Sequence, residues 1–286
     1  MSGRLRLGVA GWPVGHSLSP AMQGAALAAA GLPHRYQLLP IPPELFAETA
    51  LALPQLGFLG INVTIPHKEA ALAIADRPDE EAAAIGAANT LAFTDQGVAA
   101  FNTDGRGAVM ALREGFGLDD LAGRSALVLG AGGSARAVAY ALRQAGANVA
   151  LWARRREQAE AVARKLGVSA VERPLPAELL VNCTPVGLKA ASGLPIEQSA
   201  SQRDPLNQLG LAHDQLTEYG FLLDLVYGRR GTPLVEAFRG AGRPALDGRV
   251  VLLCQGALSF EHWFGFRPPL APMAAAVGLP WPLRAR

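Results

Sequence analysis

Two short polar clusters contain side chains able to move a proton. One, N-V-T-I-P-H-K at 62–68, ends in Lys68, and the other, N-T-D-G at 102–105, contains Asp104. Oxidation of an alcohol by hydride removal needs a group that takes the hydroxyl proton and returns it in the reverse direction. A lysine partly removed from solvent and oriented by a carboxylate suits that task. Taken singly, each residue has an ordinary alternative: Lys68 as an exposed residue of a first helical turn, and Asp104 as a helix N-cap.

Hydroxyl and amide side chains accompany this pair. Ser17 and Ser19 stand two residues apart in a loop rich in glycine and proline, an arrangement suited to binding a carboxylate. Ser19 is equally suited to cap a helix, and the local pattern favours that alternative. Asn62 and Thr64 are expected on the same side of a strand, because side chains alternate along it. Asn89 follows a short apolar run.

A glycine turn later in the chain predicts a dinucleotide site. The sequence G-A-G-G-S-A at 130–135 follows a predicted strand and opens a predicted helix, as the G-x-G-x-x-G/A fingerprint requires. Free N–H groups at such a helix N-terminus bind phosphate. A plain turn between strand and helix is the alternative. The residues of the turn are Gly130, Ala131, Gly132, Gly133, Ser134 and Ala135.

The residues after the next predicted strand indicate which dinucleotide binds. An NAD site usually carries an acidic residue there for the ribose 2′-hydroxyl, whereas an arginine accommodates a 2′-phosphate. Here Arg154, Arg155 and Arg156 follow the strand, and the first acidic residue after the strand is Glu157. The sequence therefore predicts NADP, against the alternative of three solvent-exposed arginines at the start of a helix.

Composition argues against several other classes. Of the 286 residues, 50% are hydrophobic and 17% are charged, which is typical of a globular protein. A formal net charge of +2 gives no support for nucleic acid or an anionic membrane as a partner. The longest apolar stretches fall well short of the ~18 residues of a membrane span, and none is expected. The apolar run near the N-terminus is broken by Gly8, Gly11 and Pro13, so we expect no signal peptide and place the protein in the cytoplasm. The cysteines and histidines lack metal-ligand spacing, and no metal is expected.

Short apolar runs alternate with amphipathic stretches, which predicts an α/β fold built on a mainly parallel sheet. At ~150 residues per domain, the length predicts about two domains. Pro66 is placed to open a helix, and the polar segment 189–215 is interpreted as a loop. Strands are expected at 4–10, 34–39, 58–64, 125–129, 148–152, 179–183 and 221–225. Helices are expected at 19–31, 43–53, 66–75, 105–114, from the glycine turn to 144, and at 248–264.

Taken together, these motifs resemble those of the shikimate dehydrogenase family, over nearly the whole chain. Several ordered motifs with family-like spacing are more specific than any one of them. The resemblance implies a discontinuous substrate-binding and catalytic domain, 1–105 plus 248–286, and a Rossmann-like dinucleotide-binding domain, 106–247. Further motifs that carry the resemblance are G-x-P-V-x-H-S-x-S-P at 11–20, G-A-A-N-T-L at 86–91, N-C-T-P-V-G at 182–187 and Q-G-A at 255–257.

The family resemblance implies a reversible NADPH-dependent reduction of 3-dehydroshikimate to shikimate, a step of aromatic amino-acid biosynthesis. It implies that Lys68 and Asp104 are the catalytic pair, and that Ser17 and Ser19, helped by Tyr227, hold the substrate carboxylate. The implied contacts to the ring hydroxyls come from Asn62, Thr64, Lys68, Asn89, Asp104 and Gln255. The implied cofactor contacts, besides the glycine turn, come from Arg154, Arg155, Thr184, Val226 and Gly248.

Some positions depart from the family pattern, and they concern the cofactor more than the substrate. Ala153 and Arg155 replace the asparagine and threonine of an N-R-T motif in which Arg154 is retained. Val251 occupies a position where methionine is usual.

Other activities remain open. One alternative is a relative that oxidises quinate or an amino-substituted analogue with NAD or NADP. Another is a non-catalytic sensor of shikimate or nucleotide, although a protein that only binds has no need of both Lys68 and Asp104. The expected partners are a small-molecule substrate and NADP, without nucleic acid or membrane, and the expected state is a monomer or homodimer.

Overall fold

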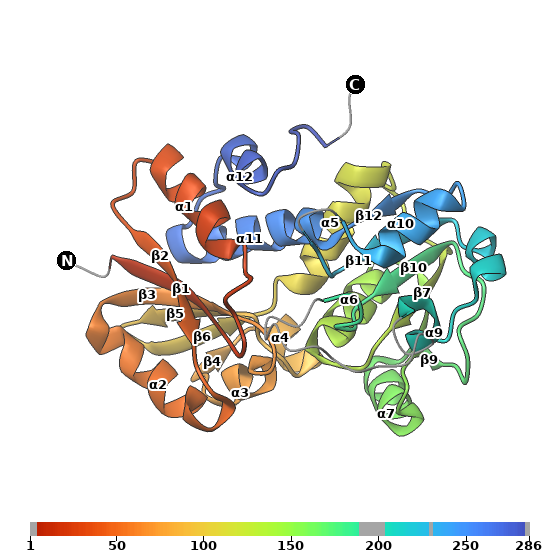
Figure 1. Cartoon of the computed structure of the whole chain (residues 1–286). Helices are drawn as coiled ribbons and strands as arrows, with labels where there is room; N and C mark the ends of the chain where they lie inside the picture. The colour runs from red at the N-terminus through yellow and green to blue at the C-terminus, as the bar shows by residue number, and fades with distance from the viewer. Residues whose placement is uncertain (1–4, 189–203, 229–230, 284–286) are drawn as a thin grey trace. The chain divides into compact units, whose positions relative to one another are not determined.

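The chain divides into two units, each with its own sheet. Unit 1 comprises residues 1–107 and 252–286, and unit 2 comprises residues 108–251. The chain leaves unit 1 within helix α5 (Asp104–Phe116) and re-enters it within helix α11 (Gly248–Phe264), so unit 1 is discontinuous in sequence (Figure 1). The computed structural model describes residues 5–188, 204–228 and 231–283.

The sheet of unit 1 is mixed. Its strands lie in the order β2-β1-β3-β5-β6-β4, with β1 parallel to β2 and β3, and β5 antiparallel to β3 and β6. The β5–β6 hairpin was not among the predicted elements. Gly97, the first residue of β6, follows its turn with a φ of 99°, a conformation that favours glycine. Register pairs Asn62 with Thr90, which places two polar residues side by side. The strands are β1 (Arg6–Gly11), β2 (Arg35–Pro40), β3 (Phe58–Val63), β4 (Arg77–Pro78), β5 (Thr90–Thr94) and β6 (Gly97–Phe101).

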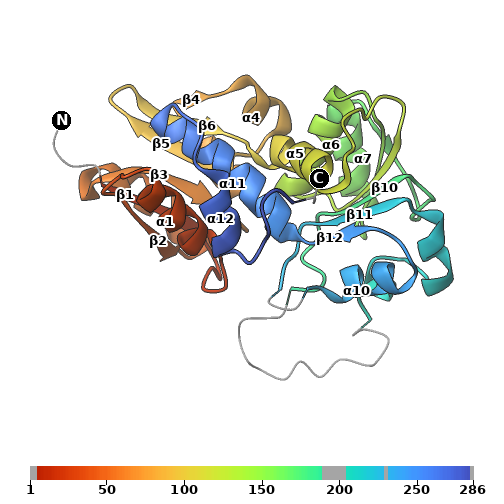
Figure 2. The same ribbon diagram turned by 90° about the horizontal axis from the view of Figure 1, so that it is seen from above.

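Apolar side chains cover both faces of this sheet. Phe46 and Phe58 belong to the cluster on one face, where α2 and α3 lie. Met22, Phe260 and Trp263 belong to the cluster on the other face, where α1, α11 and α12 lie together (Figures 1 and 2). Burial of each large apolar side chain contributes about 1.5–3 kcal/mol. The helices of unit 1, besides α11, are α1 (Ser19–Ala29), α2 (Phe46–Ala52), α3 (Lys68–Ala73), α4 (Glu80–Ile85) and α12 (Leu270–Ala276), with 3-10 turns at Pro43–Leu45 and Leu53–Leu56.

Unit 2 contains a wholly parallel sheet in the order β12-β11-β10-β7-β8-β9. This is the strand order of the doubly wound dinucleotide-binding fold. Successive strands are added outward on one side of β7 as far as β9, and then, from β10 on, outward on its other side. The central strands are nearly continuous apolar runs, as expected for strands covered on both faces. The predicted α/β fold is confirmed. The strands are β7 (Ser125–Leu129), β8 (Asn148–Trp152), β9 (Ser169–Ala170), β10 (Leu179–Asn182), β11 (Phe221–Asp224) and β12 (Ala245–Leu246); the helices are α6 (Gly133–Gln144), α7 (Arg156–Leu166), α9 (Pro205–Gln208) and α10 (Pro233–Gly240), with a 3-10 turn at His213–Glu218.

The predicted start of the helix after β3 is wrong. The helix expected over 66–75 begins at Lys68. The N–H of His67 donates to the Thr64 carbonyl at 2.9 Å, and this turn leaves Pro66 before the helix rather than within its first turn. Lys68 is therefore the first residue of α3.

The loop prediction for 189–215 is partly wrong. Residues 189–203 lie outside the described part of the chain, but residues after 203 form α9 and the start of a 3-10 turn. Asp204 caps α9 by accepting a hydrogen bond from Leu206 N–H at 2.9 Å. Leu206, Leu209 and Leu211 are buried in the core of unit 2, which explains why this polar segment is ordered there.

Several helices were not predicted, although their boundaries carry recognisable signals. The carboxylate of Asp79 caps α4 and the hydroxyl of Thr232 caps α10, each accepting from the backbone N–H three residues later. Helix α7 ends at Gly167, whose φ of 64° is typical of a helix C-cap glycine.

Candidate active site

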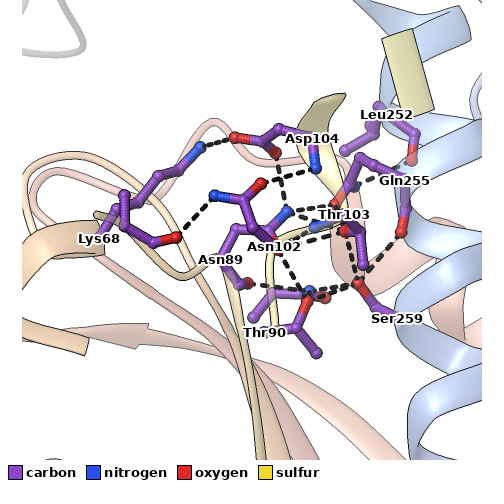
Figure 3. A network of polar contacts seen from close by, with 11 residues as sticks. Lys68, Asn89, Thr90, Asn102, Thr103, Asp104, Leu252, Gln255 and Ser259 are labelled. Atoms are coloured by element: carbon purple, nitrogen blue, oxygen red, sulfur yellow. Dashed lines mark hydrogen bonds and ion pairs between the residues drawn. The ribbon is translucent and has the colours of Figure 1, made fainter. Parts of the chain in front are cut away.

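Lys68 and Asp104 form an ion pair at the ends of two helices of unit 1 (Figure 3). Lys68 begins α3 and Asp104 begins α5, so the predicted N-cap role of Asp104 just before a helix is wrong by one position. Lys68 Nζ donates to Asp104 Oδ2, and the two side chains are only 12% and 10% exposed. Partial burial strengthens their mutual attraction and restricts the lysine to one direction.

Asn89 orients the carboxylate of Asp104. Its Nδ2 donates to Asp104 Oδ1 at 2.7 Å, while its Oδ1 accepts from the backbone N–H of Thr103 at 2.8 Å. The carboxylate can only accept and the backbone N–H can only donate, so these contacts fix which way the amide of Asn89 points. Both oxygens of Asp104 are thus engaged, one by Lys68 and the other by Asn89.

Helix α11 adds an amide to the same cluster. Gln255 Oε1 accepts from Asn89 Nδ2 at 3.2 Å, and Gln255 Nε2 donates to the Leu252 carbonyl at 3.0 Å (Figure 3). The structure therefore brings together four of the predicted residues, Lys68, Asn89, Asp104 and Gln255, from four separate segments of unit 1.

Asn62 lies in a buried layer of this network, and both ends of its amide bond to protein groups. Its Oδ1 accepts from the Tyr36 hydroxyl at 2.7 Å. Its Nδ2 lies 2.9 Å from Ser259 Oγ and 3.2 Å from Thr90 Oγ1. The side chain is only 6% exposed. These contacts make Asn62 a support for the site, and its direct contact with a ring hydroxyl stays a prediction.

Ser259 was missed by sequence reasoning. It is fully buried, and its hydroxyl contacts Thr90 Oγ1 at 2.8 Å and Thr103 Oγ1 at 3.2 Å, joining the Asn62 layer to the segment that carries Asp104. Its position four residues after Gln255 places both on one helix face, and that spacing is the signal that would have identified it.

Ser17 and Ser19 lie together where α1 begins. Ser17 Oγ donates to Ser19 Oγ at 3.1 Å and accepts from the Ser19 N–H at 3.2 Å. The N-cap position belongs to Leu18, so the interpretation of Ser19 as the helix cap is wrong. A Cβ added to Gly11 would lie 2.4 Å from Thr64 Cγ2, so only glycine lets this loop pass so close to Thr64. The two serines and Thr64 thus follow the ends of adjacent parallel strands.

His67 was also missed, and it anchors the start of α3. It is 2% exposed, its ring stacks on Phe46 at 4.5 Å, and its Nε2 lies 2.8 Å from the Ile41 carbonyl. Burial lowers the pKa of His67, although the bond to Ile41 acts in the opposite direction. Because a carbonyl oxygen only accepts, Nε2 carries the proton in this contact, and the ring fixes the backbone immediately before Lys68.

The glycine turn of unit 2 has the geometry of a phosphate site. Gly130 follows β7 with a φ of 119°, a conformation that favours glycine. Gly132 occupies the N-cap of α6 and has no side chain with which to cap it. Ala135 is fully buried, which allows close packing of the helix on the sheet. The turn therefore presents the positive end of a 12-residue helix to an anion.

The three arginines after β8 differ in their surroundings. Arg156 bonds the carboxylates of Glu160 and Glu172, and these pairs raise the pKa of its guanidinium. Arg154 and Arg155 are exposed, with no ion pair to any residue within the described ranges. Arg156 is thus committed within the protein, whereas Arg154 and Arg155 are available to an anionic ligand.

Thr184, Val226 and Gly248 lie at the carboxyl end of the unit 2 sheet. Thr184 follows β10 and donates to Asn182 Oδ1 at 2.7 Å. Val226 follows β11, and its carbonyl accepts from Gly248 N–H at 2.9 Å. Tyr227, predicted to assist with the substrate carboxylate, is the next residue and belongs to unit 2.

Metal ligands and membrane-spanning helices have no candidates in the described ranges. Nowhere in them do three or more histidine, cysteine or acidic side chains converge as metal ligands. Within the same ranges, the helices are too short or too polar to cross a bilayer.

Comparison with known proteins places the chain in a family. Residues 9–91 match the shikimate dehydrogenase substrate binding domain, and residues 248–277 match the shikimate 5′-dehydrogenase C-terminal domain. A shikimate dehydrogenase (NADP(+)) of Acidiphilium cryptum is 43% identical over 277 residues, covering 94% of both chains. Another, of Anaeromyxobacter sp., is 40% identical and covers 98% of both. The crystal structure of a shikimate 5-dehydrogenase from Thermus thermophilus in complex with NADP(H) and shikimate superposes with a TM-score of 0.82 at 39% identity, over 96% of this chain and 98% of that one. The chain belongs to the shikimate dehydrogenase family.

Proposed function

We propose that this protein catalyses the reversible NADPH-dependent reduction of 3-dehydroshikimate to shikimate. The observation that carries the proposal is the ion pair of Lys68 and Asp104, held by Asn89 in a buried polar network, in a chain of this family. NADPH, when bound, supplies the hydride that converts the substrate ketone to an alcohol.

Lys68 acts as the acid in that direction and as the base in reverse. Its ammonium gives a proton to the carbonyl oxygen as the carbon receives hydride, so the product is a neutral secondary alcohol. In the oxidation of shikimate, the neutral amine takes the hydroxyl proton as the hydride leaves. Asp104 holds the lysine in position, and Asn89 keeps Asp104 from turning away.

Polar side chains recognise the substrate. Ser17 and Ser19 bind its carboxylate, and their mutual hydrogen bond positions both hydroxyls at the N-terminus of α1, where negative charge is favoured. Tyr227 assists them. The proposed contacts to the ring oxygens are Asn62, Thr64, Lys68, Asn89, Asp104 and Gln255.

Unit 2 binds NADP. The glycine turn holds the pyrophosphate, and Arg154 and Arg155, exposed and without ion pairs to described residues, hold the 2′-phosphate. Arginine suits this task because its planar guanidinium donates in pairs to phosphate oxygens. The remaining proposed contacts are Thr184, Val226 and Gly248.

Domain roles, compartment and assembly complete the proposal. We assign the substrate to residues 1–105 and 248–286, and the dinucleotide to residues 106–247. We place the enzyme in the cytoplasm. It acts as a monomer or a homodimer, which light scattering of the purified protein would decide.

The direct test mixes the purified protein with 3-dehydroshikimate and NADPH. We expect NADPH to be consumed in equal amount to the shikimate formed, with a Lys68→Ala protein as the matched negative control. If the wild-type protein consumed NADPH no faster than the Lys68→Ala control, the proposal would be contradicted.

A further inference from the structure

A fully buried carboxylate in unit 2 has no part in the mechanism above. Asp224 ends β11 and is 0% exposed. Its Oδ1 accepts from Asn182 Nδ2 at 2.8 Å and from Val226 N–H at 3.0 Å, and its Oδ2 accepts from the Thr232 hydroxyl at 2.6 Å. A buried charge with three donors orients all three, because loss of the carboxylate would leave each donor without its acceptor.

Two of these donors connect Asp224 to the three proposed cofactor contacts outside the glycine turn and the arginines, which are Thr184, Val226 and Gly248. Asn182, held by Asp224, accepts at Oδ1 from the N–H and the hydroxyl of Thr184, at 3.0 and 2.7 Å. Val226 is bound to Asp224 directly through its N–H, and its carbonyl accepts from Gly248. One carboxylate therefore lies within two hydrogen bonds of Thr184, Val226 and Gly248.

The strand order indicates which half of the dinucleotide these positions serve. Arg154 follows β8, on one side of β7, whereas β10 and β11 lie on the other side. A dinucleotide whose pyrophosphate lies over the turn after β7, and whose 2′-phosphate reaches Arg154, extends its nicotinamide half over the ends of β10 and β11.

We propose that Asp224 is a positioning residue that holds the segments after β10 and β11 in the arrangement that receives the nicotinamide half of NADP. This inference rests on the proposed function. Asp224 touches neither substrate nor cofactor in this account, and it acts through Asn182 and the backbone of Val226. Hydride transfer is sensitive to such positioning, since a displacement of ~1 Å can cost about 100-fold in rate.

The test uses substitutions that preserve shape. Asp224→Asn leaves one oxygen, so at least one of the three donors then faces an N–H group. Thr232→Val removes one donor to Asp224, together with the hydroxyl that caps α10. The double substitution Asn182→Asp with Asp224→Asn exchanges carboxylate and amide, and restores the contacts to Thr184 and Thr232 while losing only the one to Val226. Leu216→Ala is the control, because it opens a cavity in the same core without touching this network.

Two measurements separate positioning from general destabilisation. The first is kcat with the Kd for NADP⁺; the second is saturation-transfer NMR of bound NADP⁺, which reports protein contact at nicotinamide and adenine protons separately. For Asp224→Asn we expect kcat to fall by about 10-fold or more, with Kd changed by less than about threefold. Transfer to the nicotinamide protons should weaken while transfer to the adenine protons persists. Thr232→Val should show a smaller loss, and the exchanged pair should recover part of kcat.

The outcomes distinguish this inference from the proposed function. Asp224 does not position the cofactor if Leu216→Ala, compared at equal stability, loses as much kcat and nicotinamide contact as Asp224→Asn does. It also does not position the cofactor if Asp224→Asn keeps both its kcat and its nicotinamide contact. The same holds if the exchanged pair is no better than Asp224→Asn. An inactive wild-type protein would overturn the proposed function, and the NMR measurement would still decide the role of Asp224.

Discussion

Asn89 Nδ2 donates a 2.7 Å hydrogen bond to Asp104 Oδ1, and the other oxygen of that carboxylate accepts from Lys68. Lys68, the proposed catalytic lysine, is therefore oriented by a chain of two side chains whose own directions are fixed by the protein. Such orientation before the substrate arrives lowers the entropy cost of reaching the reactive geometry.

Lys68→Ala should lower turnover far more than it weakens substrate binding, because the lysine acts chiefly in the transition state. General acid–base catalysis supplies about 100-fold to 10,000-fold in rate, and we expect kcat to fall within that range. Lys165→Ala is the control, since that lysine is exposed at the end of α7. Steady-state kinetics with shikimate and NADP⁺ provide the measurement. A rise in KM with kcat intact would remove Lys68 from the catalytic role.

Asn89→Ala should affect both stability and rate. Thr103 N–H would lose a buried acceptor and Asp104 would lose a donor, and we expect a loss of about 1–3 kcal/mol in the free energy of unfolding. Without Asn89, the carboxylate of Asp104 can turn away from Lys68, and we expect kcat to fall as well. Asn148→Ala, on an exposed strand end with one bond to the Gly123 carbonyl, is the control. Urea unfolding and steady-state kinetics on the same samples would reveal whether the two effects occur together. An unchanged kcat would show that Asn89 does not orient Asp104 and Lys68.

Arg154→Ala should weaken NADP⁺ binding far more than NAD⁺ binding. A charge-assisted contact contributes about 1.5–3 kcal/mol, which corresponds to roughly 10-fold to 150-fold in Kd for NADP⁺. Arg156→Ala is the matched control two residues away, because its guanidinium is already paired with Glu160 and Glu172. Titration calorimetry with both nucleotides gives the comparison. Equal losses for NADP⁺ and NAD⁺ in Arg154→Ala would show that this arginine does not recognise the 2′-phosphate.

The stability of unit 2 should depend on the ionisation of Asp224. Burial raises its pKa from 3.8 to about 6, although the bonds from Thr232, Val226 and Asn182 act in the opposite direction, and nearby Asp247 raises it further. The native state therefore binds this proton more tightly than the unfolded chain does. Its stabilising contribution is present below about pH 4 and is lost as the pH rises through about 6.

Asp224→Asn removes this titration. Between about pH 4 and pH 7 the wild type should lose about 2 kcal/mol of unfolding free energy relative to the variant. Urea unfolding of both proteins at several pH values measures the difference. A difference that does not change with pH would contradict the raised pKa.

Local motifs allowed part of this site to be predicted from the sequence. The glycine turn between β7 and α6 has a fixed backbone requirement, and Lys68 and Asp104 lie in short polar clusters after apolar strands. The wrong assignments at Ser19 and Asp104 came from treating as caps two side chains that the structure uses for other contacts.

The supporting network could not be predicted in the same way, because its partners are distant in sequence. Asn62 and Ser259 are 197 residues apart, and Asn182 and Asp224 are 42 apart. Buried polar side chains need partners, but only the folded topology decides which ones meet. The segment that forms α9 was missed for a related reason, since its leucines become a core only when packed on unit 2.

The reduction of nicotinamide by shikimate or quinate, each with NADP⁺ or NAD⁺, tests the central claim most directly. The four rates are measured with one preparation of wild-type protein, and with Lys68→Ala as the blank. We expect turnover with shikimate and NADP⁺ to exceed the other three combinations clearly. Faster turnover with quinate or with NAD⁺, or no turnover in any of the four mixtures while NADP⁺ still binds, would contradict the proposed function.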